Sequence, residues 1–186
     1  MDRFDTADVY STIRPAAIGQ VAIIPFREKL KSFSSLEQLA DFKTVRIIKT
    51  NAQWTTSFFK FCGGMVLSEE KQDFSVAAQR ELQQETGIVC PIDGFHEILR
   101  TQKRQFAPHF GKFDVVLYVA FGCDFATMFD PLYREVGDED EESATVRFDD
   151  IMDPNKTWPI PTKPQQQAKM FGLHLEWLRQ VRQNLK

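Results

Sequence analysis

The sequence predicts an α/β fold in which strands lie on both sides of a central helix and a second helix closes the chain. Three observations support this fold. Residues 73–87 have the pattern of a helix. Strand-like apolar or alternating runs precede and follow that helix. The region 163–186 contains an amphipathic segment, Gln165 to Asn184. The 186 residues suit a single domain, and no internal repeat divides them.

The stretch before the central helix is expected to contain three strands. Residues 20–26 are almost entirely apolar, which is typical of a buried strand, and residues 42–49 alternate between polar and apolar. A third β-like run, residues 54–61, leads to Gly63-Gly64. Residues 1–18 are interpreted as an irregular N-terminal arm, and a short helix is expected around residues 35–40.

Three further strands are expected after the central helix. Residues 94–106 and 112–122 have the pattern of two antiparallel strands joined by a turn at residues 108–111, and residues 144–148 form the next strand. A short helix or turn is expected at residues 149–151. Four prolines between residues 154 and 164 predict a loop, because proline lacks the backbone N–H that regular structure uses.

The central helix has signals at both ends and two distinct side-chain strips. Asp73 or Ser75 can cap its start, and Gly87 can adopt the left-handed conformation that ends a helix. One strip is apolar and consists of Phe74, Ala78 and Leu82. Glu81 and Glu85 lie together on the adjoining strip, although like charges four residues apart repel by a few tenths of a kcal/mol. This pair of facing carboxylates suggests that a cation lies between them.

The stretch from Gly63 to Ile88 resembles the signature of the Nudix (MutT-like) hydrolases, G-x5-E-x7-R-E-U-x-E-E-x-G-U, in which U is a bulky aliphatic residue. The matching positions here are Gly64, Glu70, Arg80, Glu81, Leu82, Glu85, Gly87 and Ile88. There are two departures from the pattern. The loop before the helix is two residues longer, so either Glu70 or Gln72 takes the place of the first glutamate. Gln84 stands where the family usually has the first acid of the Glu-Glu pair.

The resemblance implies a single Nudix domain, an αβα sandwich with a mixed central sheet and a C-terminal helix. It also implies an enzyme that uses Mg²⁺ or Mn²⁺ to hydrolyse a diphosphate linkage in a nucleoside diphosphate derivative, with ADP-ribose or a nucleotide sugar slightly favoured. The implied metal ligands are Glu81 and Glu85, with Glu70 as a third; Glu69 is a further carboxylate on the longer loop. Arg80 is implied to orient a glutamate through charge-assisted hydrogen bonds.

Other candidate residues lie outside the signature. Many members of the family take the general base from a later loop. The acidic run 138–142 is the corresponding candidate here, and Glu142 is the specific residue. The alternative is a solvated acidic loop. Arg100 and Arg104 are candidates for contacts with substrate phosphates, or they belong to an ordinary basic hairpin. Gly64 would let the backbone approach a ligand closely. Trp54, Phe58 and Phe106 could stack on a base but equally fit a core.

The two departures, Gln84 and the longer loop, also motivate a second interpretation, because an amide brings no charge to a metal. In that interpretation the protein is a catalytically impaired Nudix-fold module that binds a nucleotide or a protein. The net charge of −3 gives no bulk attraction to nucleic acid or membrane. Three scattered cysteines without a CxxC pair, and an N-terminus without a signal-peptide pattern, favour a cytoplasmic protein. Its expected partner is a small nucleotide; a homodimer stays open.

Overall fold

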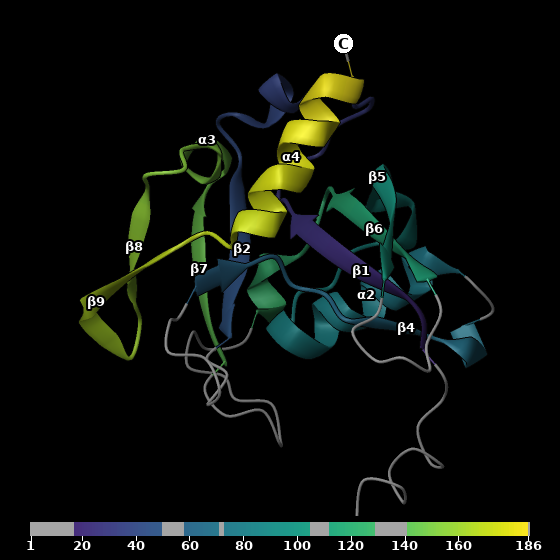
Figure 1. Ribbon diagram of the computed structural model, residues 1–186, viewed down its shortest axis with the longest axis horizontal. Coiled ribbons are helices and arrows are strands. Elements are labelled where there is room, and N and C mark those ends of the chain that lie inside the picture. Colours follow the sequence, from purple (N-terminus) through teal and green to yellow (C-terminus); the bar gives the residue numbers. More distant parts are fainter. Residues whose placement is uncertain (1–16, 50–57, 71–72, 105–111, 129–140, 186) are drawn as a thin grey trace, which may run out of the picture.

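The computed structural model describes residues 17–49, 58–70, 73–104, 112–128 and 141–185, and it confirms the mixed α/β fold (Figure 1). The central sheet has the strand order β4-β1-β6-β5. β1 (Ala17–Pro25) is parallel to β6 (Lys112–Ala120) and antiparallel to β4 (Met65–Leu67). β5 (Phe95–Arg104) is antiparallel to β6. One parallel and two antiparallel pairings make this sheet mixed.

A second sheet leads the chain into the central one. It has the order β3-β2-β7, from β3 (Phe58–Lys60), β2 (Lys43–Lys49) and β7 (Glu141–Arg147), and both pairings are antiparallel. After β3 the backbone crosses to β1, where the Cys62 carbonyl accepts a hydrogen bond from Ile23 and the Gly64 carbonyl accepts one from Val21. The Gly63-Gly64 segment is therefore fixed between the two sheets.

The two long helices cover opposite faces of the central sheet, α2 (Phe74–Thr86) on one and α4 (Gly172–Asn184) on the other (Figure 1). Side chains alternate along β1 accordingly. Val21 and Ile23 pack in the core that contains α2, whereas Ala22 and Ile24 pack in the core that contains α4. This is the sandwich expected from the sequence.

The ends of α2 form as the sequence predicts. The Asp73 carboxylate accepts hydrogen bonds from the backbone N–H groups of Ser75 and Val76, at 3.1 and 3.4 Å, so Asp73 is the cap. Gly87 ends the helix with a φ of 72°. The three residues of the predicted apolar strip, Phe74, Ala78 and Leu82, are all buried. The helix that carries Glu81 and Glu85 therefore has a fixed start, end and rotation.

The C-terminal region departs from the prediction. The proline-rich segment is not a loop: β8 (Thr157–Ile160) and β9 (Lys163–Lys169) form a hairpin, which packs Trp158 and Ala168 into the core. Pro159 is tolerated because a sheet of two strands has only edge strands, and β8 is one of them. Consequently the C-terminal helix begins at Gly172, not near residue 163.

Smaller differences concern element boundaries. β1 begins at Ala17, within the predicted arm of residues 1–18, and residues 1–16 lie outside the described part. β7 begins at Glu141, three residues before the predicted start. The short helix after it is α3 (Phe148–Met152). Four single 3-10 turns complete the described elements: η1 (Leu36–Leu39), η2 (Ser68–Glu70), η3 (Ile92–Gly94) and η4 (Phe125–Thr127). None of the described helices is long and apolar enough to cross a membrane.

Candidate functional site

The two helical glutamates face the Gly63-Gly64 segment. Glu85 is buried, and its Oε2 accepts a hydrogen bond of 2.7 Å from the backbone N–H of Gly63. Its Oε1 lies 3.9 Å from Nζ of Lys60, the last residue of β3. The Glu81 carboxyl group lies against Gly64, where an added Cβ would come within 2.5 Å of the carboxyl carbon and both oxygens. A side chain at position 64 would therefore push the Glu81 carboxylate out of its present position.

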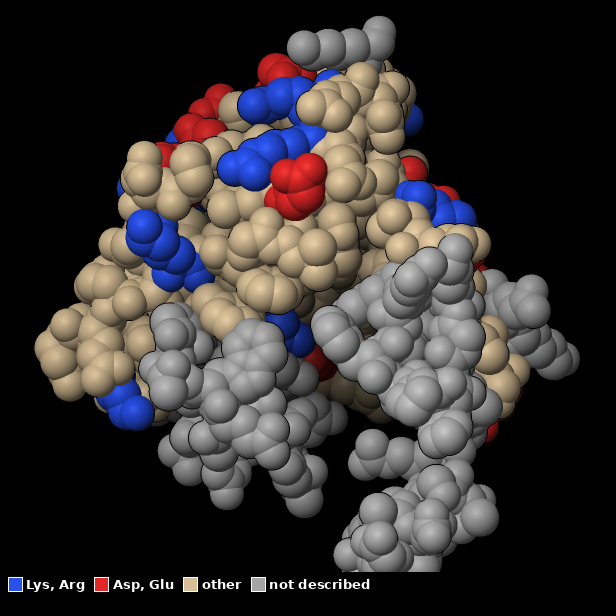
Figure 2. All heavy atoms as spheres, in the orientation of Figure 1, with Lys and Arg blue, Asp and Glu red and all other residues tan. Residues whose placement is uncertain are grey.

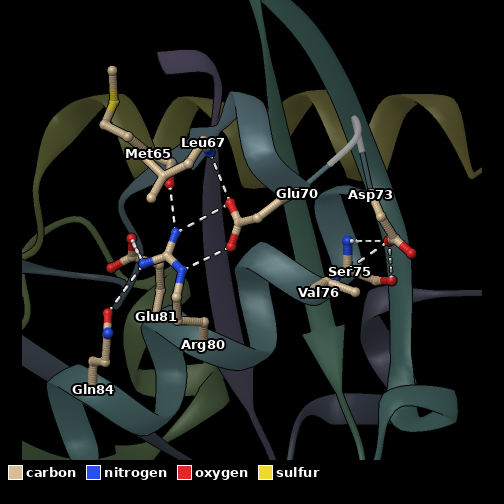
Figure 3. A network of polar contacts seen from close by, with 9 residues as sticks. All are labelled: Met65, Leu67, Glu70, Asp73, Ser75, Val76, Arg80, Glu81 and Gln84. Atoms are coloured by element: carbon tan, nitrogen blue, oxygen red, sulfur yellow. Dashed lines mark hydrogen bonds and ion pairs between the residues drawn. The ribbon is translucent and has the colours of Figure 1, made fainter. Parts of the chain in front are cut away.

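Arg80 is the centre of a polar network that joins α2 to the preceding loop (Figure 3). Its Nε donates to Oε1 of Glu70 at 2.7 Å, and its Nη1 donates to Oε1 of Glu81 at 2.7 Å. Nη1 also donates to the amide oxygen of Gln84 at 3.0 Å, and Nη2 donates to the Met65 carbonyl at 2.8 Å. The planar guanidinium can do this because its donors point in fixed, divergent directions.

Of the two candidates for the first glutamate of the signature, Gln72 lies outside the described residues, and Glu70 lies in η2. Its Oε2 accepts from the Leu67 N–H at 2.7 Å and from Nη2 of Arg80 at 3.3 Å. Burial alone would raise the pKa of Glu70, but the hydrogen bonds from Arg80 and Leu67 outweigh it and lower that pKa below its ordinary value. The Arg80–Glu70 pair therefore stabilises the folded protein at neutral pH, and this contribution is lost as the pH falls through the lowered pKa.

The carboxylates Glu81 and Glu85 are the residues that fit a divalent cation. They supply hard oxygen donors from successive turns of one helix, and Gly64 leaves space beside Glu81. Among the described residues no group of three or more His, Cys, Asp or Glu side chains forms a metal cluster. Glu70, the third ligand expected from the sequence, has both oxygens bound to Arg80 or Leu67. A magnesium or manganese ion held by two protein carboxylates would keep most of its positions for water and substrate.

Cys62 lies beside this site without adding a ligand. It is completely buried, and its Sγ donates to the Ile23 carbonyl at 3.4 Å. Burial, and then the neighbouring carboxylate of Glu85, raise the pKa of the Cys62 thiol well above its ordinary value. The thiol therefore stays protonated. Because only the thiolate binds metals well, Cys62 does not compete with the glutamates for a metal.

The remaining candidate residues are not joined to this site in the described structure. Arg100 is held by Glu97 and Asp114, at 2.7 and 3.0 Å, on the exposed surface of β5. Arg104 also lies in β5, but its side chain is outside the described part. Glu142 lies in β7, where its backbone pairs with Ile48 of β2. The side chain of Glu142 and residues 138–140 are outside the described part.

Of the three aromatic candidates for stacking on a base, Phe58 alone lies within the described residues. Phe58 stacks on Phe171, with ring centroids 4.6 Å apart, so its partner is another side chain. Trp54 and Phe106 lie outside the described residues.

Sequence reasoning missed two residues near the site. Lys60 precedes Gly63 by three positions, and only the alternation of β3 could have placed it on the side away from buried Phe59. His174, considered incidental from its spacing, is buried in α4, and its Nδ1 accepts a hydrogen bond of 2.9 Å from the Phe61 N–H. No local signal in the sequence connects His174 with Phe61, 113 residues earlier.

Replacing Arg80 with lysine should weaken the site although the charge is kept. One ammonium group cannot reach Glu70, Glu81 and the Met65 carbonyl together. We expect Mn²⁺ affinity to fall about 10- to 100-fold and the free energy of unfolding to fall by about 1–3 kcal/mol. Calorimetric titration with Mn²⁺ and urea unfolding measure the two effects. Arg147→Lys is the matched control, because Arg147 also pairs with two carboxylates but on the exposed surface. Equal metal affinity in wild type and Arg80→Lys would contradict this role.

Comparison with solved structures finds the same fold at low sequence identity. The crystal structure of an ADP compounds hydrolase superposes with a TM-score of 0.53 and 16% identity, covering 92% of this chain and 75% of that one. The crystal structure of a protein described as a NUDIX hydrolase, from Listeria monocytogenes, superposes with a TM-score of 0.51 and 14% identity. The match covers 89% of this chain and 92% of that one. A third match is the crystal structure of a MutT/nudix family protein from Enterococcus faecalis, with 14% identity and a TM-score of 0.45. It covers 79% of the present chain but spans only 51% of the length of the Enterococcus protein.

A search of curated proteins found no match. The family model of the NUDIX domain, however, matches residues 36–171, which include the β3-β2-β7 sheet, strands β4, β5 and β6 of the central sheet, the Gly63-Gly64 segment and the whole of α2. The matched region begins before β2 and ends at the residue that precedes α4. With the mixed sheet between two helices and the Arg80-centred network on α2, this match shows that the chain belongs to the Nudix family.

Proposed function

We propose that this Nudix protein hydrolyses a diphosphate linkage in a nucleoside diphosphate derivative with the help of Mg²⁺ or Mn²⁺. The observation that carries the proposal is the arrangement of Glu81 and Glu85 against Gly63-Gly64, with Arg80 holding Glu81 in place. Carboxylates fixed by such outer contacts keep their geometry when a cation binds.

The proposed division of roles follows from these contacts. Glu81 and Glu85 hold the cation, which when bound neutralises charge on the bridging phosphates and lowers the pKa of a coordinated water. Arg80 orients Glu81, and the Gly63 N–H orients Glu85. Glu70 holds Arg80. We assign the general base to the acidic run 138–142, with Glu142 as the specific residue to test, because a proton must leave the attacking water.

The proposed substrate is a small nucleotide derivative, with ADP-ribose or a nucleotide sugar ahead of a nucleoside triphosphate. A long polyanion would need an extended basic surface. On the face drawn in Figure 2, the described Lys and Arg side chains are interspersed with Asp and Glu, and they form no continuous basic patch there. Arg100 and Arg104 on β5 remain proposed phosphate contacts; for Arg100, such a contact would have to compete with Glu97 and Asp114.

The experiment that tests this function measures phosphate release, after coupled phosphatase, from ADP-ribose, nucleotide sugars, dinucleoside polyphosphates and nucleoside triphosphates. Metal-dependent turnover of one class supports the proposal and identifies the substrate. We expect Glu142→Gln to lower kcat by about 10²- to 10⁴-fold if Glu142 is the base. Silence across the panel, from folded protein that still binds a nucleotide, favours the second candidate.

The second candidate is a Nudix-fold module that binds a nucleotide or a protein without turnover. Gln84 is the observation that favours it, because its exposed amide supplies no negative charge to a metal and its oxygen accepts from Arg80.

Gln84→Glu distinguishes the two candidates. The new carboxylate keeps the contact with Arg80 and adds a negative charge one residue before Glu85. We expect it to tighten Mn²⁺ binding about tenfold, which corresponds to about 1.4 kcal/mol, and to raise kcat/KM if the protein is an enzyme. Gln83→Glu, on the neighbouring exposed position, is the control. Tighter metal binding without any turnover would favour the binding module.

A further inference from the structure

Residues 61–64 run along an edge of the central sheet, where they lead from β3 into the edge strand β4. On one side of this segment, backbone carbonyls accept hydrogen bonds from β1. Two of its backbone N–H groups instead bind side chains. The Gly63 N–H donates to Glu85 of α2 at 2.7 Å, and the Phe61 N–H donates to Nδ1 of His174 at 2.9 Å. Because His174 belongs to α4, each of the two long helices contributes one side chain to this segment.

His174 takes the position that a backbone carbonyl would have in a continued strand pair. Phe59 of β3 forms a parallel bridge with Met170, and its carbonyl accepts a hydrogen bond of 2.7 Å from the Phe171 N–H. The next hydrogen bond of a parallel ladder would run from the Phe61 N–H to the Phe171 carbonyl. That carbonyl instead accepts from N–H groups in the first turn of α4. The imidazole therefore supplies an acceptor to β3 at the point where the chain changes from strand to helix.

The imidazole ring combines two properties at this position. His174 is buried, and its ring stacks on those of Phe61 and Trp177, with centroids 4.9 and 4.7 Å away. Because the Phe61 N–H is a fixed donor, Nδ1 is the acceptor and carries no proton. Among side chains, only histidine has an aromatic ring with a nitrogen acceptor in the plane of that ring. Asparagine could supply the acceptor alone, and phenylalanine could supply the ring alone.

We propose that His174 is a positioning residue of the carboxylate site, which it supports by fixing the backbone two residues before Gly63. This inference rests on the proposed function and deepens it. A shift of the Phe61 N–H passes along the backbone to the Gly63 N–H, which holds Oε2 of Glu85. The segment has no space to absorb such a shift, because a Cβ added at Gly63 would lie 2.1 Å from the Val21 carbonyl oxygen. An acceptor on α4 thereby orients a carboxylate on α2.

Two substitutions separate this role from simple packing. His174→Phe keeps an aromatic ring and removes the acceptor, whereas His174→Asn keeps an acceptor and removes the ring. The asparagine oxygen branches from Cγ, as Nδ1 does in histidine, so it can reach the Phe61 N–H. If His174 matters only for packing, His174→Asn is the more damaging change. If His174 positions the backbone, His174→Phe is the more damaging change to the site.

The experiment combines calorimetric titration of the full chain with Mn²⁺ and the amide proton chemical shift of Gly63 in the metal-free protein. For His174→Phe we expect Mn²⁺ affinity to fall about three- to tenfold, less than the roughly 10- to 100-fold typical of a residue that contacts a metal ligand directly. We also expect the Gly63 amide proton to move upfield, because its hydrogen bond to the Glu85 carboxylate weakens. His174→Asn should keep both quantities close to those of wild type.

Val181→Ala is the matched control for a loss of stability. Val181 is fully buried on the same helix, about 10 Å along its axis from His174. Its truncation removes packing without touching the acceptor. This variant should unfold at a lower urea concentration than wild type, with unchanged Mn²⁺ affinity and an unchanged Gly63 shift.

Unchanged Mn²⁺ affinity in His174→Phe overturns the inference. So does an equal loss of affinity in His174→Asn or Val181→Ala, because the effect would then follow packing and not the acceptor. A measurement on wild type depends on no variant: the chemical shifts of the two imidazole nitrogens of His174 should show the proton on Nε2 at neutral pH. A proton on Nδ1 overturns the inference as well.

The outcome is separable from the proposed hydrolysis. If wild type binds no Mn²⁺, the metal-dependent hydrolysis fails, and the Gly63 shift in His174→Phe and His174→Asn decides whether His174 positions the backbone. If wild type binds Mn²⁺ and turns over a substrate, and His174→Phe keeps the same Mn²⁺ affinity and kcat, the hydrolase proposal stands and the positioning role fails.

Discussion

Replacing Glu85 with glutamine is expected to abolish metal-dependent hydrolysis while the protein stays folded. The amide has the same shape as the carboxylate and can still accept the hydrogen bond from the Gly63 N–H, so the local structure keeps its main contact. The charge that attracts a divalent ion is lost, however, and metal stabilisation of transition-state charge is worth several kcal/mol. We expect kcat/KM to fall by at least about 10³-fold and Mn²⁺ affinity to fall with it. Initial rates on the best substrate of the panel and calorimetric titration measure both.

Glu176→Gln is the control for this experiment. Glu176 also lies on a helix and pairs with an arginine, Arg179, at 3.2 Å, but it lies on the exposed surface of α4. It should leave rate and metal affinity unchanged. Full activity in Glu85→Gln would remove Glu85 from the metal site, and with it the central element of the proposed mechanism.

Replacing Gly63 with alanine should have the largest effect on stability. Gly63 has a φ of 146°, a conformation that residues with a Cβ rarely adopt, and the added Cβ would lie 2.1 Å from the Val21 carbonyl oxygen. Both obstacles are backbone, so no side chain can move away to relieve them. We expect a loss of about 3 kcal/mol or more in the free energy of unfolding, which lowers Tm by about 6–12 °C for a chain of this size.

Thermal and urea unfolding measure this loss, and Gly172→Ala is the matched control. A Cβ at Gly172 meets nothing within 4 Å, and alanine is favoured over glycine inside a helix. That variant should be as stable as wild type or slightly more stable. If Gly63→Ala unfolds at the wild-type temperature, the close passage of this segment beside β1 does not exist in solution.

Local patterns predicted the elements that carry the site. Asp73, Gly87 and the apolar strip all belong to one helix, α2. Their spacing along the sequence therefore predicts where this helix starts, where it ends and which side of it faces the core. The same spacing places Glu81 beside Glu85. The family resemblance then added the sheet and the layers, which no local pattern could provide.

Contacts between distant segments could not be predicted in this way. The proline content of residues 154–164 indicated a loop, yet burial of Trp158 against Phe59 favours a hairpin with Pro159 on an edge strand. Lys60 reaches Glu85 because β3 passes into the Gly63-Gly64 segment, a consequence of the sheet order. Likewise, the hydrogen bond that Arg80 donates to the Met65 carbonyl depends on how a loop folds back over a helix.

The hydrogen bond between the Gly63 N–H and Glu85 joins residues 22 positions apart and so closes a ring around almost the whole family signature. The entropy of closing a ring grows only with the logarithm of its length, so two extra residues in a ring of this size cost about 0.1 kcal/mol. The lengthened loop before α2 therefore leaves the two ends of the ring, and both glutamates, where a shorter loop would place them. Insertions between Glu70 and Asp73 are accordingly expected to be tolerated far better than any change at Gly63 or Glu85, which makes this loop the part of the signature most open to evolutionary change in length.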